Sequence, residues 1–458
     1  VVRVRFHFGG LYDREEVALS KPFSNWPPFS ASFTNPSATN LLITTGELQV
    51  QLVLSNKFQV HFLDTAGRDL LRDFQLEWNL DYHPIDDTAG YAQGWTNESA
   101  GVSNLPSGFK LKAIKVMPTN EAYFGLGDFA GPLNRRGRIL QFWNQDTYAF
   151  SELRNPKYTA LPFWYGVQGA TTARAAFAYG VLFNNPARPV VELTSGLGDT
   201  YAFHAGDDQI DYFFFGGGSN HTMEAVLQRY AELTGRPAFL PRWAYGYHQS
   251  RHTYFTQQEV QDVVDGFRTS DIPCDAVYLD IGVQSGESQN HQLTFNSGFS
   301  NVAGMVSYAT NRGVRLVPLV EPLLTTNDPL YGAALSNLYF IKRNDLGSYL
   351  GTNFLGRISW LDYSIQQTRD WWQEQLTNYL GAYGFEALWN DLTEPNENAM
   401  PLNSIWYLDG RYGGGLVTTD SRKWHSNNKN TYSVLSSQVS RGALLARRPD
   451  RRPFVLTR

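Results

Sequence analysis

The sequence contains one cysteine and no long uncharged apolar run. A single thiol excludes a disulfide within the chain. Cys274 follows a proline at the start of an apolar stretch, so we expect it to be a small buried side chain. A membrane-spanning helix needs about 20 consecutive apolar residues. Gly, Asn and Pro interrupt the apolar runs well before that length, so we expect no membrane span.

Charged residues are also scarce, at 18% of the chain, and the net charge is −5. No stretch rich in Lys and Arg appears before the paired arginines at 447–448 and 451–452. Binding to nucleic acid depends on clustered positive charge. We therefore expect no nucleic-acid partner.

Several motifs of metal and cofactor chemistry are missing. There is no His-Glu-x-x-His, no calcium-binding EF-hand loop and no Gly-x-Ser-x-Gly. The glycines at 216–218 lack the lysine and the following helix of a phosphate-binding loop, so we interpret them as a turn. We therefore expect neither a metal nor a cofactor.

Aromatic residues are abundant, at 14% of the chain, with 12 Trp and 25 Tyr. Most of them are expected in a core, but the same composition suits a protein that stacks flat rings against sugars. The length of 458 residues predicts two or three domains with ample apolar material for their cores.

Up to about residue 241 the sequence shows short strand-like segments separated by clusters of Gly, Pro, Asn, Asp and Ser. This spacing predicts an antiparallel β-sandwich over residues 1–222. Helical periodicity from Met223, ended by Gly-Arg-Pro at 235–237, predicts a linker helix within residues 223–241. The expected strands lie at residues 2–8, 42–54, 58–63, 108–116, 175–182 and 209–215.

From residue 242 strand-like and helical segments alternate, which predicts a (β/α)8 TIM barrel over residues 242–458. About five of the eight β/α units are present, so we expect the sequence to stop inside the barrel. The expected strands lie at residues 244–248, 275–281, 314–320, 385–390 and 453–456, and the expected helices at 256–269, 302–312, 366–383 and 433–447.

Three of these strands end in a carboxylate: Asp280, Glu321 and Asp391. A parallel barrel brings successive strand ends to one rim. Clustered carboxylates there suit cleavage of a glycosidic bond, because a positive oxocarbenium-like centre develops and needs anionic partners. On spacing alone, Asp391 could equally open the turn before Pro395, and grouped acids could also bind Ca²⁺ or Mg²⁺.

The motif Trp-Asn-Asp-Leu-Thr-Glu-Pro at 389–395 resembles the nucleophile signature of glycoside hydrolase family 31, usually Trp-Asn-Asp-Met-Asn-Glu-Pro. Phe-Gly-Leu-Gly-Asp at 124–128 resembles a turn in the N-terminal domain of that family. Leu-Thr-Gly-Arg-Pro at 233–237 resembles its entry to the barrel. The segments 245–251 and 452–458 resemble its first barrel strand and the strand before its acid/base loop.

This resemblance assigns roles to individual residues. Asp391 would be the nucleophile of a retaining mechanism, forming a covalent glycosyl-enzyme. Asp280 and Arg458 would bind sugar hydroxyls beside it, and Trp389 would wall the pocket. Asp146 matches an acid on a loop of the N-terminal domain that reaches over the barrel mouth.

The sequence departs from the family pattern around the same pocket. Leu392 stands where Met is usual, and His252 stands where many members have Trp. Phe354 replaces a pocket tryptophan of many α-glucosidases. We count these three among the substrate-binding residues and expect an altered glycone preference or transfer to an acceptor. The acid/base aspartate of the family follows the strand of Arg458, so no residue of this chain can be assigned that role.

The predicted function is a retaining α-glycosidase of the α-glucosidase type, with transglycosylation as a variant outcome, acting on an oligosaccharide or α-glucoside. The alternatives are a carbohydrate-binding protein without a working acid, and an α-glucan lyase that uses the same nucleophile. We expect a second polypeptide or a C-terminal continuation to complete the barrel. The start at Val1 without Met, and possible N-glycosylation sites at Asn97 and Asn220, predict a processed, secreted or extracellular protein.

Overall fold

The computed structural model describes residues 1–7, 19–20, 25–26, 29–55, 57–82, 109–146, 157–172, 175–194, 199–207, 209–286, 290–343, 347–395 and 425–458. The described residues up to Pro237 form one compact unit, and those from Ala238 to Arg458 form a second. Asn97 lies outside the described residues, whereas Asn220 is exposed. The division into 1–222, 223–241 and 242–458 stays a prediction.

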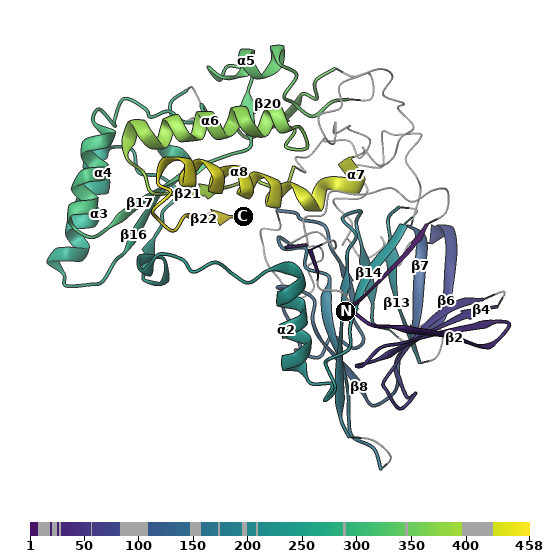
Figure 1. Ribbon diagram of the computed structural model, residues 1–458. Helices are drawn as coiled ribbons and strands as arrows, with labels where there is room; N and C mark the ends of the chain where they lie inside the picture. The colour runs from purple at the N-terminus through teal and green to yellow at the C-terminus, as the bar shows by residue number, and fades with distance from the viewer. Residues whose placement is uncertain are drawn as a thin grey trace. The chain divides into compact units, whose positions relative to one another are not determined.

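The N-terminal unit contains two antiparallel sheets among its described residues (Figure 1). One has the strand order β1-β14-β11-β10-β8 and the other β2-β3-β4-β5-β6-β7-β13-β12-β9. The unit is thus rich in antiparallel β-sheet, as predicted. Its strands are β1 Val2–His7, β2 Ser32–Ser37, β3 Asn40–Thr44, β4 Gln49–Leu54, β5 Phe58–Leu63, β6 Asp69–Tyr82, β7 Phe109–Val116, β8 Glu121–Gly125, β9 Ile139–Gln141, β10 Phe163–Gln168, β11 Phe177–Phe183, β12 Val190–Glu192, β13 Thr200–Ala205 and β14 Gln209–Phe215.

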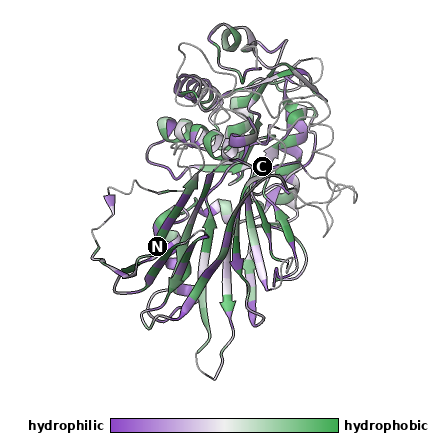
Figure 2. Cartoon of the chain, turned by 90° about the vertical axis from the view of Figure 1, so that its right-hand side faces the viewer, coloured by the Kyte–Doolittle hydropathy of each residue, from purple (hydrophilic) through white to green (hydrophobic). Residues whose placement is uncertain are grey.

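Hydrophobic segments run along these strands (Figure 2), and aromatic rings from both sheets form the core. Phe62 of the larger sheet stacks on Phe214 of the smaller one, with ring centroids 3.9 Å apart. The single strand expected over residues 42–54 was wrong: β3 and β4 form a hairpin. The hydroxyl of Thr45 donates to the carbonyl of Leu48 (2.8 Å) in the turn between them, so the chain reverses there.

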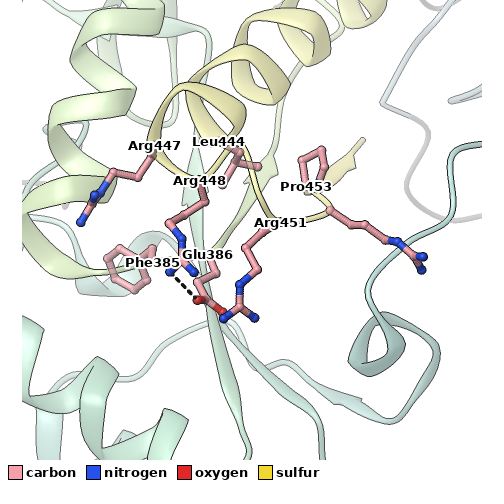
Figure 3. A pocket seen from close by; sticks show the side chains of 8 residues that line it. Phe385, Glu386, Leu444, Arg447, Arg448, Arg451 and Pro453 are labelled. Carbon is pink, nitrogen blue, oxygen red and sulfur yellow. Dashed lines mark hydrogen bonds and ion pairs between the residues drawn. The ribbon is translucent and has the colours of Figure 1, made fainter.

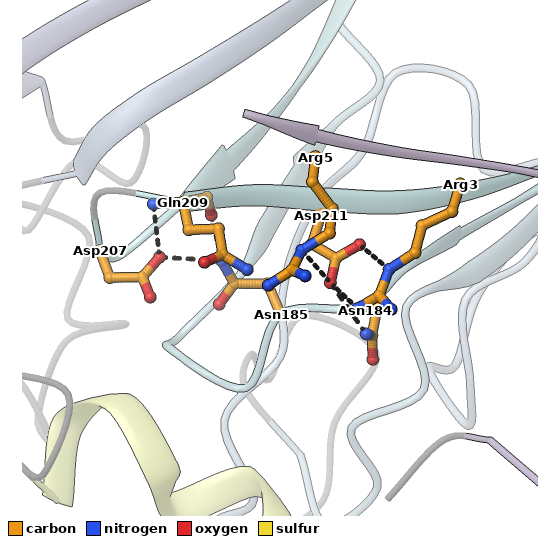
Figure 4. Close-up of polar contacts among 7 residues, drawn as sticks. All are labelled: Arg3, Arg5, Asn184, Asn185, Asp207, Gln209 and Asp211. Carbon is orange, nitrogen blue, oxygen red and sulfur yellow. Dashed lines mark hydrogen bonds and ion pairs between the residues drawn. The ribbon is translucent and has the colours of Figure 1, made fainter. Parts of the chain in front are cut away.

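A buried aspartate holds the first strand in place. Asp211 of β14 is 1% exposed and accepts two hydrogen bonds from the guanidinium of Arg3 on β1, with Nε 2.9 Å from Oδ1 (Figure 4). The amide of Asn184 donates to the same carboxylate at 3.1 Å. Because a buried charge without partners is costly, these contacts select the pairing of β1 with β14.

The helix α2, Met223–Thr234, packs on this unit. The side chain of Thr222 accepts from the backbone N–H of Ala225, which caps the helix start. Val226 and Leu233 on its apolar face join a cluster with Phe163 and Phe215.

One end of the sandwich core is polar. The hydroxyl of Tyr179 donates to the Glu121 carboxyl (2.5 Å), and nearby Lys115 is paired with Asp73 and donates to the hydroxyl of Tyr212. Burial raises the pKa of Glu121 to about 7, although the Tyr179 hydrogen bond acts in the opposite direction. Glu121 therefore changes charge near neutral pH.

The C-terminal unit contains a parallel sheet with the order β15-β16-β17-β21-β22 among its described strands (Figure 1). Its strands are β15 His248–Gln249, β16 Ala276–Leu279, β17 Arg315–Val320, β21 Ala387–Asn390 and β22 Phe454–Thr457. The intervening helices are α3 Gln257–Thr269, α4 Val302–Asn311, α6 Gln366–Tyr383 and α8 Tyr432–Arg447. Successive helices contact one another along the chain, so the unit is the partial barrel that the alternation predicts.

The first predicted barrel strand, 244–248, was wrong in its position. Pro241 precedes a 3-10 turn, η3 Arg242–Tyr245, and Gly246 closes it with an N–H to the carbonyl of Trp243 (3.1 Å). Strand β15 begins only at His248.

Between β17 and α6 lies a small antiparallel sheet that the sequence did not predict. It has the order β18-β20-β19, and its strands are too short to show a period. Its elements are β18 Leu323–Thr325, β19 Gly351–Asn353, β20 Gly356–Trp360 and helix α5 Tyr331–Ser336; the other short segments of the unit are η4 Ile281–Val283, α7 His425–Asn428 and η6 Lys429–Thr431.

The amino ends of β21 and β22 carry an arginine cluster (Figure 3). Glu386 pairs with Arg315 at 2.9 Å and with Arg448 at 3.5 Å, which ties the end of α8 to the strands. Cys274, at the same end of β16, is buried as predicted. In the part of the chain that the structure describes, no helix has the length and apolar character to cross a membrane.

We predict that Glu121 makes the protein less stable as the pH rises from about 4.5 to about 7. In that interval the Glu121 carboxyl group releases its proton in the unfolded chain but keeps it in the folded protein. A pKa difference of about 2.5 corresponds to about 3 kcal/mol of unfolding free energy. Glu121→Gln should remove this pH dependence in urea unfolding, and Glu47→Gln, at an exposed side chain, should not. Equal slopes in the parent and Glu121→Gln would contradict the prediction.

Candidate active site

The inner side of the parallel sheet continues into charged residues at the strand ends. The core inside the sheet is formed by alternate residues: Ala276, Tyr278, Val317, Ala387, Trp389 and Phe454. Side chains of a strand alternate between its two faces. At the carboxyl ends of these strands, the residues of the same parity are Asp280, Glu321, Asp391 and Arg458, with Leu319 and Leu456 intervening on β17 and β22. Strand register brings the last three to one level, because Val320 lies opposite Asn390 and Asn390 opposite Thr457.

The structure brings Asp391 and Arg458 into direct contact. Nη1 of Arg458 donates to Oδ1 of Asp391 at 2.9 Å, and the same nitrogen lies 3.6 Å from Oε1 of Glu394. Asp391 retains 16% exposure of its side chain, whereas Glu394 is 3% exposed. One nitrogen of Arg458 therefore faces both a buried acid and a partly exposed acid, and part of the Asp391 side chain stays open to a ligand.

Asp280 shares the electrostatic environment of this pair. Burial raises the pKa of Asp280, and the negative charge of Asp391 raises it further. The N–H of Ile281, donated at 2.6 Å, and the positive charges of His252 and Arg458 act in the opposite direction. Asp280 and Asp391 are thus close enough to influence each other, although β17 lies between their strands in the sheet.

Glu321, the third acid, is held by residues that carry no recognisable motif. The side-chain nitrogen Nε2 of Gln292 donates to Oε2 of Glu321 at 2.7 Å. The side-chain oxygen Oε1 of Gln292 accepts from the backbone N–H of Glu321 at 2.9 Å. The backbone N–H of Gln292 in turn donates to buried Asp328 at 2.7 Å. No described group of three or more His, Cys, Asp or Glu is arranged to hold a metal ion.

Trp389 is fixed from inside the barrel. Its ring meets that of Tyr278 edge to face, with centroids 5.7 Å apart. Nε2 of His248 lies 3.3 Å from the carbonyl oxygen of Trp243, to which it can only donate a hydrogen bond. In that tautomer Nδ1 of His248 accepts a hydrogen bond from the hydroxyl of Tyr278 at 3.1 Å. This chain of contacts was missed from the sequence because it joins three strands that are distant along the chain.

The loop that carries Asp391 is anchored on both sides. The hydroxyl of Ser440 on α8 donates to Oδ1 of Asn390 at 2.7 Å, and the hydroxyl of Thr393 donates to the carbonyl of Arg458. Leu392 is buried and has φ = +49°, a left-handed conformation that costs a residue of this type about 1–2 kcal/mol. Strained backbone of this kind concentrates at functional sites.

The remaining predicted residues are less engaged. His252 is exposed and hydrogen-bonds to Thr253 at 3.0 Å, but its charge acts on Asp280. Phe354 is 71% exposed at the turn between β19 and β20, and no described contact joins it to Asp391. Asp146 belongs to the N-terminal unit, where the hydroxyl of Tyr158 donates to it at 2.9 Å. Its placement over the barrel stays a prediction.

Family models match both parts of the chain. The N-terminal galactose mutarotase-like domain of glycosyl hydrolase 31 matches residues 1–192, and the TIM-barrel domain of glycosyl hydrolases family 31 matches residues 237–458. The chain belongs to glycoside hydrolase family 31. The resemblance of the 389–395 motif is thereby confirmed at the level of the family.

Curated relatives of this family 31 chain include several α-glucosidases. Alpha-glucosidase 2 of Bacillus thermoamyloliquefaciens is 31% identical over 354 residues, which cover 75% of this chain and 42% of the relative. The alpha-glucosidase of Saccharolobus solfataricus is 25% identical over 303 residues, covering 65% and 41%. The chain therefore spans less than half the length of these relatives.

Solved structures show the same fold. A dextranase of family 31 from Flavobacterium johnsoniae, complexed with glucose, matches with a TM-score of 0.76 at 24% identity, covering 97% of this chain and 49% of that one. An alpha-xylosidase of the family from a soil metagenome, complexed with xylose, matches with a TM-score of 0.73 at 18% identity, covering 99% and 61%.

We predict opposite pKa shifts of Asp280 in two variants. Asp391→Asn should lower this pKa because it removes a negative charge that opposes ionisation, and Arg458→Met should raise it because it removes a positive charge. NMR titration of the Asp280 carboxyl carbon measures both. Asp450→Asn, an exposed change in the loop before β22, should leave it unchanged. Shifts of the same sign in the first two variants would contradict this account of the site.

Proposed function

We propose that this chain forms the N-terminal domain and the first five β/α units of a retaining α-glycoside hydrolase of the α-glucosidase type, with Asp391 as the nucleophile. The observation that carries the proposal is the contact between Asp391 and Arg458 on the inner strand ends, with Asp280 within electrostatic range. The family membership and the names of the relatives support the reaction class.

In the proposed first step, an oxygen of Asp391 bonds to the anomeric carbon as the bond from that carbon to the leaving-group oxygen breaks. The leaving oxygen takes a proton from a general acid. In the second step the group that served as the general acid acts as a base and removes a proton from water. The water oxygen then bonds to the anomeric carbon and displaces the Asp391 carboxylate. Arg458 donates a hydrogen bond to one oxygen of Asp391, Oδ1, and so orients the carboxylate for attack on the sugar.

The charge balance of the site supports this mechanism. Asp280, Asp391 and Glu394 place three carboxyl groups around one guanidinium, that of Arg458. Positive charge develops on the sugar ring in the transition state, so fixed negative groups stabilise it more than they stabilise the neutral substrate. Asp280 would hydrogen-bond sugar hydroxyls and fix the ring above Asp391.

We propose that the general acid/base lies outside residues 1–458. The chain spans less than half the length of its α-glucosidase relatives, and the acids at the described strand ends already have other proposed or structural roles. A C-terminal continuation or a second polypeptide would then supply this residue and the remaining barrel strands. Secretion stays a proposal, supported by the exposed position of Asn220.

Substrate preference is proposed only at the level of an α-glucoside. Relatives and structural neighbours are named for α-glucosidase, α-xylosidase and dextranase activity, so family membership does not choose among glycones. His252, Phe354 and Leu392 are the proposed determinants. Analysis of the products separates hydrolysis, transfer to an acceptor hydroxyl and elimination to an anhydrosugar, because all three begin from the same covalent intermediate.

We predict that Asp391→Ala lowers kcat on an aryl α-glucoside at least about 1,000-fold. This corresponds to an increase of about 4 kcal/mol in the activation free energy. Asp391 is an accessible rim residue, so the melting temperature should change little. Asp450→Ala is the control, because that exposed acid lies near the amino ends of the barrel strands. A loss of less than about tenfold would contradict the nucleophile assignment.

A further inference from the structure

A cavity opens at the polar end of the N-terminal unit. It has a volume of about 220 Å³ and lies between the start of β6, the end of β7, the start of β8 and the end of β10. Residues of both sheets therefore line it. The lining residues include four with polar side chains, Asp69, Arg72, Glu121 and Gln168, and apolar residues such as Leu71 and Val116.

The polar groups of the cavity differ in depth. Asp69 and Arg72 are about half exposed and lie 3.6 Å apart, so they form a balanced pair at the mouth. Glu121 is only 4% exposed, and the hydroxyl of Tyr179 donates to one oxygen of its carboxyl group at 2.5 Å. Gln168 is half-buried and supplies both an amide donor and a carbonyl acceptor.

A buried carboxyl group beside an open cavity is unusual for a purely structural core. Burial of an acid destabilises a fold unless hydrogen bonds compensate, and its high pKa means that burial is not fully compensated here. A perturbed acid at the wall of a cleft marks a candidate binding site. Near neutral pH the Glu121 carboxyl can either donate or accept a hydrogen bond, as a hydroxyl-bearing ligand requires.

Size and charge restrict the ligand. At about 30 Å³ per molecule, the cavity corresponds to about seven waters, which suits one sugar ring rather than an oligosaccharide. The mouth carries one positive and one negative group, so it favours neither an anion nor a cation. We propose that this cavity is a second ligand site that binds a neutral polyhydroxyl molecule of monosaccharide size.

The site is independent of the reaction proposed at Asp391, because all of its lining residues belong to the N-terminal unit. Hydrogen exchange followed by mass spectrometry tests it in the complete protein, with glucose as the probe. Increasing glucose should slow exchange in peptides that cover residues 69–72 and 116–121. Peptides that cover residues 387–395 report the barrel site separately, so failure of one proposal is distinguishable from failure of the other.

Gln168→Leu should raise the glucose concentration for half-maximal protection of the cavity peptides at least tenfold, because it removes a donor and an acceptor at similar volume. Gln228→Leu, on the exposed side of α2, is the matched control and should leave it unchanged. Arg72→Met provides a second variant, at an exposed side chain, in case Gln168→Leu does not fold. Absence of protection at saturating glucose, protection that is unaffected by both cavity variants, or protection by sulfate in place of glucose would overturn the proposal.

Discussion

The period of two along parallel strands is the constraint on which the candidate active site depends. Residues that fill the inner core at one end of a strand share their face with the residue at its carboxyl end. Tyr278 is therefore followed on its face by Asp280, and Trp389 by Asp391. The apolar part of the strand fixes the register, and the register fixes where the carboxyl groups meet.

Acids that meet in this way repel one another, and the surrounding contacts offset that repulsion. Arg458 lies between Asp391 and Glu394, and the backbone N–H of Ile281 donates to Asp280. Their effect is incomplete at Asp280, whose pKa remains raised. An excess of negative charge stabilises a cationic transition state. Because folding brings these carboxyl groups together before the substrate binds, no further reorganisation is needed during the reaction.

Much of this site could be predicted from the sequence because its main residues follow short, strongly apolar strands. Asp280 and Asp391 end such strands, and the 389–395 motif identifies the family. Gln292 could not be predicted, because it lies in an irregular segment and contacts Glu321 only through the folded chain. The tie from His248 to Tyr278 was missed for the same reason. The sequence prediction was also wrong for two short elements next to turns. Residues 244–245 belong to a 3-10 turn, and residues 42–54 form a hairpin with its turn at Thr45.

The central claim is that Asp391 attacks the sugar, and covalent trapping tests it most directly. A fluorinated α-glucoside that forms the glycosyl-enzyme but releases it slowly should add one sugar mass to the peptide that covers residues 387–395, and fragmentation should place that mass on Asp391. Trapping on Asp280, Glu394 or another residue would contradict the claim.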